Sequence, residues 1–271
     1  MKMIVCDLDG SLLRPSGGLF VSEQVRKKLI QLQEKGVMVV LNSARIFQGI
    51  YPLSKQIEME RFGGYIIADN GCQVFDVKTQ KNWFGWPISR EKALQVWSIC
   101  QKYELSPAIA TPDYVVAKYS TEGYELDMKN CGVNYIFTNN PETLMKEPIW
   151  KCTMSASEKE IDENWEGFVR EINEACDLQV VRSTKNFVDI IEKNVDKYTA
   201  NNELLKRLNL SWSDVAAIGD GLPDLKVIAH AGLGVTLENG KEEVKKVAKM
   251  IVGHCEKDGC IELFDLLMQE K

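Results

Sequence analysis

This sequence has few histidines and no closely spaced cysteine pair, and both features limit the kinds of catalytic and metal site to be expected. Only His230 and His254 supply imidazole groups, and neither stands beside a candidate nucleophile, so acid–base chemistry is expected from carboxylates. The eight cysteines contain no C-x-x-C pair, and a chain of 271 residues can bury a core without disulfide bonds. We therefore expect reduced thiols and no zinc site.

Long apolar runs and clusters of basic residues are also missing. No stretch of about eighteen apolar residues is present to span a bilayer, and the first residues lack the charged-then-apolar pattern of a signal peptide. The net charge of −6, without any run of Lys or Arg, argues against a nucleic-acid surface. These absences predict a cytoplasmic globular protein with neither a membrane nor a nucleic-acid partner.

Short apolar runs alternate with amphipathic segments at both ends of the chain. A strand is predicted at 2–6, then a helix that Ser22 caps and Gly36 ends, then a strand at 37–42. Continuous apolar strands joined through a helix are typical of parallel strands buried on both faces. Near the C-terminus, KYTANNELLKRL and LPDLKVIAHA are predicted helices on either side of a strand in DVAAIGD. Both ends are therefore predicted to form one doubly wound, mainly parallel α/β layer.

The middle of the chain differs in composition from both ends. It holds five of the six tryptophans, at positions 83, 86, 97, 150 and 165, among strand-like segments such as YVVAKYS. We therefore predict an inserted domain at residues 82–189, and a core domain formed by residues 1–81 and 190–271.

The segment MIVCDLDGSLL places two carboxylates at the end of the first predicted strand. Ligands bind outside the carboxyl ends of the strands in open parallel sheets, and residues two apart in an extended chain point to the same side. Asp7 and Asp9 are therefore predicted to face one cleft, where their repulsion calls for a cation or a shared proton. An EF-hand loop is excluded because Leu12 and Gly18 occupy the positions of its required Gly and Glu. A solvated turn remains the alternative.

Polar residues also follow the second predicted strand and begin a later helix. VVLNSAR contains Ser43 and Arg45, a hydroxyl and a fixed positive charge that suit a phosphate, with a helix cap as the alternative for Ser43. Lys197 stands in the first turn of a helix behind the capping residue Asp196. A lysine at this positive end of a helix favours a nearby anion, unless it is simply a solvated surface residue.

A second pair of carboxylates follows the strand in AAIGDGLPDLKVI. Asp220 ends this strand and Asp224 comes four residues later, while Gly219 and Gly221 permit a close approach to the cleft. The glycine pair lacks the third glycine of a dinucleotide-binding fingerprint, and Asp220 would repel a pyrophosphate. The pattern therefore argues against a dinucleotide-binding loop.

Taken together, these motifs resemble those of the haloacid dehalogenase (HAD) superfamily of phosphohydrolases. The order is D-x-D-G-S, a hydroxyl, a lysine and then G-D-G-x-x-D, and the segments IIADNGCQVF and AGLGVTLENGKEEVKKVA are also similar to family segments. The closest resemblance is to Cof-type phosphatases, which carry a large α/β cap between the second and third motifs. This resemblance covers essentially the whole chain. It implies a Rossmann-like core with the inserted region as the cap.

The resemblance implies a role for each matching residue. Asp7 would be the nucleophile and Asp9 the general acid and base, while Ser43 and Lys197 would hold the phosphate. Arg45 would either contact the substrate or pair with a carboxylate of the core.

The resemblance also implies a Mg²⁺ site. Asp7, Asp220 and the backbone carbonyl of Asp9 would be the ligands, with Asp224 behind them. Three residues depart from the family pattern: Ser11 stands where Thr is usual, Ala44 where Gly is usual, and Pro223 where Asn is usual.

The implied activity is the Mg²⁺-dependent hydrolysis of a small phosphorylated metabolite, a sugar phosphate or similar compound, through an aspartyl-phosphate. A phosphomutase on the same fold is an alternative, which differs in passing the phosphoryl group to a sugar hydroxyl instead of water. A phospho-ligand-binding module without turnover is another, and Ala44 and Pro223 are the features that favour it.

Overall fold

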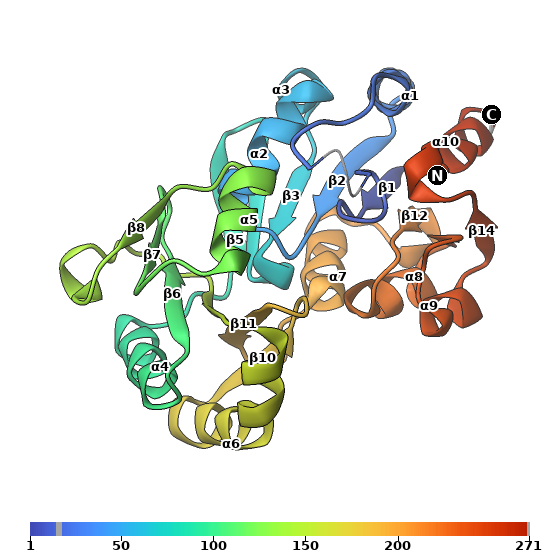
Figure 1. Ribbon diagram of the computed structural model, residues 1–271. Coiled ribbons are helices and arrows are strands. Elements are labelled where there is room, and N and C mark those ends of the chain that lie inside the picture. The colour runs from blue at the N-terminus through green and yellow to red at the C-terminus, as the bar shows by residue number, and fades with distance from the viewer. Residues whose placement is uncertain (15–17, 270–271) are drawn as a thin grey trace. The chain divides into compact units, whose positions relative to one another are not determined.

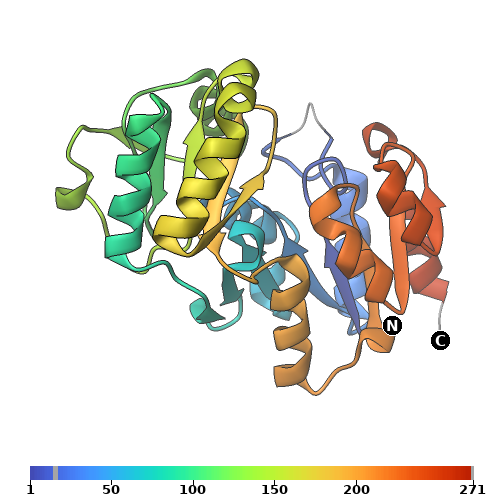
Figure 2. The same cartoon turned by 90° about the horizontal axis from the view of Figure 1, so that it is seen from below.

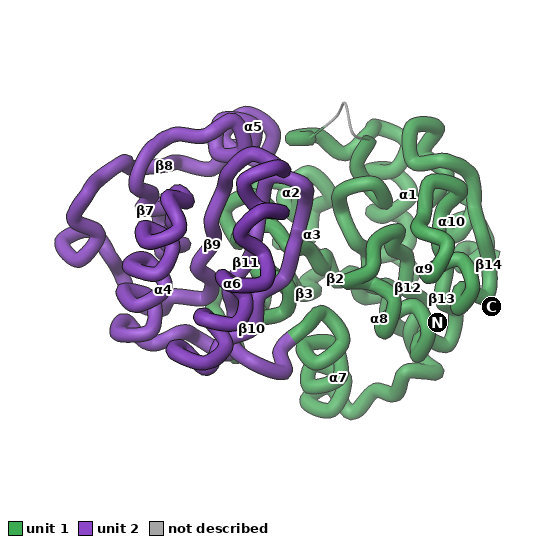
Figure 3. The backbone as a smooth tube through the Cα atoms, turned by 60° about the horizontal axis from the view of Figure 1, so that its bottom comes forward, with its two compact units in different colours: residues 1–84, 196–271 green, residues 85–195 purple. Residues whose placement is uncertain are grey.

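The chain divides into two compact units in a computed structural model that describes residues 1–14 and 18–269. Unit 1 comprises residues 1–84 and 196–271, and unit 2 comprises residues 85–195 (Figure 3). The division therefore lies at 84/85 and 195/196, compared with 81/82 and 189/190 from composition. The expected second boundary falls inside a strand, β11 (Phe187–Glu192), which belongs wholly to unit 2.

Unit 1 is built on a mainly parallel sheet. In chain order its strands are β1 (Met3–Cys6), β2 (Met38–Asn42), β3 (Tyr65–Ala68), β4 (Gln73–Asp76), β5 (Lys81–Gly85), β12 (Val215–Ile218), β13 (Leu233–Leu237) and β14 (Met250–Val252). Across the described residues their order is β14-β13-β12-β1-β2-β3-β4-β5. Every pairing from β14 to β3 is parallel, and β4 runs antiparallel to β3. The interior position of β1 suits its fully buried sequence MIVC.

Helices cover both faces of this sheet. They are α1 (Glu23–Glu34), α2 (Phe47–Gln56), α3 (Met59–Phe62), α7 (Lys197–Leu208), α8 (Leu225–His230), α9 (Glu242–Val247) and α10 (Cys260–Gln269). Figures 1 and 2 show α1 and α10 side by side on one face, with α7 and α8 on the other. Helix α1 begins where the Ser22 hydroxyl accepts a hydrogen bond from Val25 N at 3.3 Å. Two residues beyond its end, Gly36 has a φ of +86°, the left-handed conformation that glycine readily adopts there.

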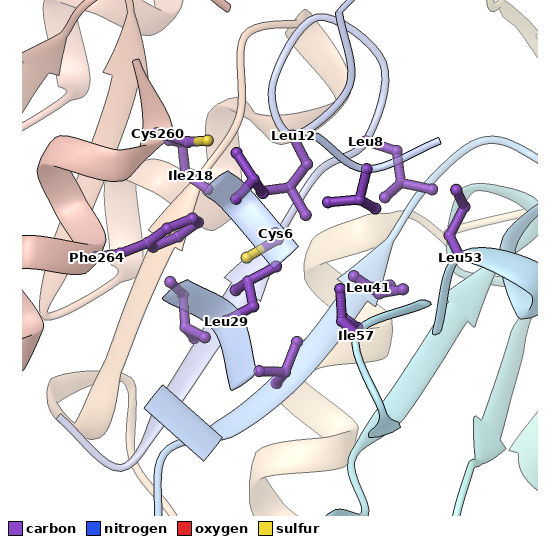
Figure 4. Packing of buried hydrophobic residues seen from close by; sticks show 14 of the residues in the cluster. Cys6, Leu8, Leu12, Leu29, Leu41, Leu53, Ile57, Ile218, Cys260 and Phe264 are labelled. Atoms are coloured by element: carbon purple, nitrogen blue, oxygen red, sulfur yellow. The ribbon is translucent and has the colours of Figure 1, made fainter. Parts of the chain in front are cut away.

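The larger apolar core lies between this sheet and α1, α2 and α10. Leu41 of β2 belongs to this cluster together with Leu29 of α1 and Phe264 of α10 (Figure 4). Each fully buried side chain of this size contributes about 1.5–3 kcal/mol of stability. Cys6 and Cys260 lie in the same cluster, where burial raises the pKa of both thiols, that of Cys260 to about 12. Every cysteine in the described part of the chain is a free thiol.

Unit 2 has an α/β fold of its own, in which most strand pairs are antiparallel. Its strands are β6 (Ser106–Ala110), β7 (Val115–Ala117), β8 (Tyr135–Phe137), β9 (Cys152–Ser155), β10 (Leu178–Arg182) and β11, and its helices are α4 (Arg90–Lys102), α5 (Glu122–Cys131) and α6 (Glu158–Cys176). Trp97 of α4 is buried in its core, and Trp165 of α6 packs against the same cluster. In contrast, Trp83 lies on β5 and stacks on Tyr65 of unit 1, so it is not part of the insertion.

Short 3-10 helices complete the structure. They are η1 (Asp69–Gly71), η2 (Pro141–Thr143), η3 (Trp212–Asp214), η4 (Leu222–Asp224) and η5 (Cys255–Lys257). The mainly parallel sheet with an inserted α/β unit confirms the fold class predicted from the sequence. No helix in residues 1–14 and 18–269 is long and apolar enough to cross a membrane.

Asp214 closes η3 and ties the start of the chain to the segment before β12. Its carboxylate accepts hydrogen bonds from Ser211 N at 2.9 Å and Ser211 Oγ at 2.8 Å, and it pairs with Lys2 at 3.0 Å. The backbone hydrogen bond, the Lys2 interaction and the Ser211 hydroxyl lower the pKa of Asp214 to about 2 from an ordinary value of 3.8. Because the folded-state pKa lies below the unfolded one, this stabilisation is present above pH 3.8 and is lost as the pH falls through about 2.

We therefore expect Asp214→Asn, which keeps one oxygen acceptor but loses the charge, to lower the urea concentration at the unfolding midpoint at pH 7. The difference from the wild type should shrink as the pH falls from 4 towards 2. Urea titrations of both proteins across this range measure it. A difference of the same size at every pH would contradict the electrostatic origin.

Candidate active site

Asp7 and Asp220 meet because their strands are neighbours in the parallel sheet. Asp7 follows β1 directly and continues its ladder by donating from its N–H to Ile218 O at 2.9 Å. Ile218 is the last residue of β12, and Asp220 follows two residues later. The carboxyl ends of parallel strands lie at one edge of a sheet, where loops from different strands converge. The side chains of Asp7, Asp220 and Asp224 each offer a ligand atom within 4.8 Å of the others.

Lys197 joins this group from the first residue of α7. Its side chain is only 3% exposed, and Nζ donates to Asp7 Oδ1 at 2.6 Å and to Asp224 Oδ1 at 2.7 Å. Asp196 caps the helix by accepting from Thr199 N at 2.7 Å, which fixes the backbone from which Lys197 projects. Burial opposes the charge of Lys197, but attraction to Asp224 and Asp7 outweighs it and raises the pKa of the ammonium group. The lysine is therefore a buried cation with anionic partners, and the surface-residue alternative is wrong.

The cluster carries more negative than positive charge. Among the described residues, three carboxylates lie beside one ammonium group, which contacts two of them, so with all three ionised the cluster has two more negative charges than positive ones. Burial, followed by repulsion from Asp224, raises the pKa of Asp7 well above its ordinary value despite the attraction of Lys197. The same two effects raise the pKa of Asp220. Oxygen donors with a surplus of two negative charges fit a hard divalent cation such as Mg²⁺, which favours carboxylate ligands.

Gly10 and Ser11, which follow Asp9, bring this loop against Asp220. Ser11 Oγ donates to Asp220 Oδ1 at 2.9 Å, so serine supplies the hydroxyl at a position where threonine is usual in the family. Gly10 has a φ of +82°, and a Cβ there would lie 2.6 Å from Asp220 Oδ2. Asn239 supports the loop by donating to Gly10 O at 2.7 Å and accepting from Cys255 N at 3.0 Å. Asn239 was not predicted as a site residue, although it lies in the segment AGLGVTLENGKEEVKKVA.

Asp224, the last residue of η4, also bonds to the backbone at the start of that helix. Its Oδ2 accepts from Gly221 N at 3.0 Å, while its Oδ1 bonds to Lys197. Pro223 lies between Gly221 and Asp224 in the first turn of this short helix, where a missing N–H costs little. The family's usual amide side chain is thus replaced by a residue that suits the local backbone.

Ser43 lies at the end of β2 and is 2% exposed. Its Oγ accepts a hydrogen bond from Arg45 N at 3.1 Å, and its own N–H donates to Ile67 O of β3 at 2.9 Å. Helix α2 begins only at Phe47, with Ile46 at its cap, so the alternative that Ser43 caps this helix is wrong. The role of Ser43 as a phosphate ligand stays a prediction.

Arg45 pairs with Asp9 in a two-pronged ion pair. Its Nε lies 2.8 Å from Asp9 Oδ2 and its Nη2 lies 2.5 Å from Asp9 Oδ1. Nη1 donates to Gly18 O at 3.0 Å and Gly49 O at 3.3 Å. The Arg45 side chain is 6% exposed, whereas that of Asp9 is 57% exposed. Of the two alternatives for Arg45, the structure therefore contains the carboxylate pair, and the carboxylate is Asp9.

The predicted site residues thus fall into two connected groups. Lys197, Asp220 and Asp224 gather around Asp7, whereas Asp9 pairs with Arg45. The catalytic and ligand roles of these residues remain predictions. The arrangement provides a buried carboxylate beside a fixed cation, with a second carboxylate exposed to solvent two residues along the chain.

Comparisons with known proteins identify the family of this chain. A family model for haloacid dehalogenase-like hydrolases matches residues 4–264. The chain is 23% identical over 260 residues to the 5-amino-6-(5-phospho-D-ribitylamino)uracil phosphatase YcsE of Bacillus subtilis (strain 168), covering 96% of this chain and 92% of YcsE.

Two solved structures extend the similarity to three dimensions. A haloacid dehalogenase-like hydrolase from Bacteroides thetaiotaomicron is 27% identical, with a TM-score of 0.90 over 98% of this chain and 99% of that one. The HAD subclass IIB sugar phosphatase BT4131 is 18% identical, with a TM-score of 0.80 over 99% of each chain, and shares the fold. The predicted superfamily and enzyme class are confirmed: the chain belongs to the haloacid dehalogenase-like hydrolases.

Proposed function

We propose that this hydrolase is a Mg²⁺-dependent phosphatase that acts on a small phosphorylated metabolite, such as a sugar or polyol phosphate. The observation that carries the proposal is the buried Asp7 carboxylate, held by Lys197 within a cluster of three carboxylates and one ammonium group. The names of YcsE and BT4131, a phosphoribityl-compound phosphatase and a sugar phosphatase, support the substrate class.

Asp7 is the proposed nucleophile. It attacks phosphorus while the bond to the leaving oxygen breaks, which gives an aspartyl-phosphate, and Asp9 donates its proton to that oxygen. Water then attacks the phosphorus and gives a proton to Asp9, and the bond between phosphorus and Asp7 breaks to release phosphate. Both carboxylates return to their starting states.

Positive charge and hydrogen-bond donors support these steps. Lys197 and Ser43 are proposed to stabilise the phosphoryl oxygens. The raised pKa of Lys197 keeps its ammonium group protonated. When held by Asp7, Asp220 and the backbone carbonyl of Asp9, Mg²⁺ would supply charge that offsets the repulsion between a phosphate dianion and the Asp7 carboxylate.

Arg45 is proposed to orient Asp9. The guanidinium engages both oxygens of the Asp9 carboxylate, so this exposed side chain is held in one direction instead of sampling its rotamers. Proton transfer then requires one of these two hydrogen bonds to break, so that the freed Asp9 oxygen carries the proton, gives it to the leaving oxygen and later takes one from the attacking water. Arg45 would therefore act through Asp9 and not through the phosphate.

The proposed activity is tested with a panel of sugar and polyol phosphates and p-nitrophenyl phosphate, with Mg²⁺ or with EDTA. We expect release of inorganic phosphate that requires Mg²⁺ and is lost in Asp7→Asn. Release no greater than that of Asp7→Asn would contradict the proposal. An isomeric sugar phosphate as the product would identify a phosphomutase, and binding without any product would identify a ligand-binding module.

Asp9→Asn and Asp220→Asn separate proton transfer from metal binding. Asp9→Asn should keep Mg²⁺ affinity close to that of the wild type, because the proposed ligand is its backbone carbonyl, while turnover falls about 10²–10⁴-fold. The fall should be smaller for p-nitrophenyl phosphate, whose leaving group hardly needs a proton. Asp220→Asn should weaken Mg²⁺ binding as well as slow the reaction. Calorimetric Mg²⁺ titrations and steady-state kinetics measure both effects, and a strong loss of Mg²⁺ affinity in Asp9→Asn would show that its side chain is a metal ligand.

Arg45→Lys keeps the positive charge but removes the two-pronged contact with Asp9. We expect kcat for a sugar phosphate to fall roughly 10–10²-fold, within the range of general acid–base catalysis, with KM nearly unchanged and a smaller effect on p-nitrophenyl phosphate. Steady-state kinetics on both substrates provide the measurement. If KM rises for every substrate while kcat is unchanged, Arg45 contacts the substrate directly.

A further inference from the structure

The turn η1, between β3 and β4, has an unusual backbone. Three successive residues lie in the left-handed region, Asp69 with φ +55°, Asn70 with φ +57° and Gly71 with φ +106°. Asp69 is 1% exposed and Asn70 is 4% exposed. Two non-glycine residues in this conformation are strained, and such strain persists where the surrounding structure enforces it, often beside functional sites.

The backbone of this turn is bonded to the segment that follows β2. Asn70 N donates to Ser43 O at 3.2 Å, and Asp69 N donates to Arg45 O at 2.9 Å. Both residues have a role in the proposed reaction. Ser43 is a proposed phosphate ligand, and Arg45 is the partner of Asp9. The left-handed conformation aims consecutive N–H groups of the turn at the backbone of both.

The other side of the turn packs against the start of α7, beside which it lies in Figure 1. A Cβ at Gly71 would lie 2.6 Å from the carbonyl carbon of Asp196 and 3.1 Å from Lys197 N, and closer still to the Asp196 carbonyl oxygen. Only glycine therefore allows this approach. The backbone from which Lys197 projects rests directly on the turn.

We propose that the turn Asp69–Asn70–Gly71 is a positioning element that sets the spacing between Ser43 and Lys197, the two proposed phosphate ligands. The inference rests on the proposed function of these two residues. The turn touches the backbone of both, one through a hydrogen bond and the other through close packing. A change that pushes the turn away from either neighbour therefore moves one phosphate ligand relative to the other.

Gly71→Ala tests this spacing, with Gly36→Ala as the matched control. Both substitutions place Ala at a positive φ, but a Cβ at Gly36 meets nothing within 4 Å among the described atoms, whereas at Gly71 it meets the start of α7. Calorimetry with inorganic phosphate in the presence of Mg²⁺ should show at least about tenfold weaker binding for Gly71→Ala, and kcat/KM should fall roughly 10²-fold, as expected for small misplacements at a site. Gly36→Ala should lower the melting temperature without changing either value.

A second pair of variants keeps the test decisive if Gly71→Ala does not fold. Asn70→Gly and Asn70→Val both remove the amide side chain, but only Val resists the left-handed conformation. Asn70→Gly should retain a phosphate affinity and a KM close to those of the wild type. Asn70→Val should bind phosphate more weakly and have a higher KM. A merely structural role would lower the active fraction, and hence kcat, while leaving KM and the phosphate dissociation constant unchanged.

The inference would be overturned by wild-type phosphate affinity in Gly71→Ala, or by equal losses in the two Asn70 variants. A wild type that binds phosphate without hydrolysing any substrate would end the proposed function, while the affinities of the variants would still test the turn. A wild type that does not bind phosphate would overturn the inference too, because the turn would then have no phosphate ligands to place.

Discussion

The buried ammonium group of Lys197 joins three segments that are distant in the sequence. It bonds to Asp7 at the end of β1 and to Asp224 in η4, and it does so from the start of a helix that follows the inserted unit. Taking a charge out of water is costly, and losing one partner of a buried ion pair typically costs about 3–5 kcal/mol because the other charge is left unpaired. Asp7 and Asp224 can therefore be buried only because Lys197 is paired with them.

Much of this site could be predicted from the sequence because a parallel sheet brings strand ends together. Asp7 and Asp220 each follow a short apolar run, and pairing between β1 and β12 suffices to place them at one edge. The position of Lys197 at the first turn of α7 was already electrostatically odd, and its two carboxylate partners account for it. In each case the signal was local, a polar residue at the boundary of a strongly patterned element.

Features that depend on contacts between loops were not predictable in this way. The pairing of Arg45 with Asp9 requires the chain after β2 to fold back over the loop after β1, and no periodicity encodes that. The strained turn at Asp69–Gly71 is visible in the sequence only as an Asp-Asn-Gly triplet, and these residue types are also typical of ordinary surface turns. Composition also placed Trp83 in the insertion, because a tryptophan on an edge strand of one unit resembles a core residue of the next.

The insertion of unit 2 within unit 1 has a consequence for biosynthesis. The ribosome completes β1 to β5 first, then makes roughly a hundred residues of unit 2, and only afterwards supplies β12 to β14. At about 5–20 residues per second, the nascent β1 waits on the order of 10 s for one of its two neighbours. During that interval the edge of the apolar strand β1 stays unpaired, and such an open edge can pair with another chain, so the half-built sheet is exposed to aggregation until β12 is made.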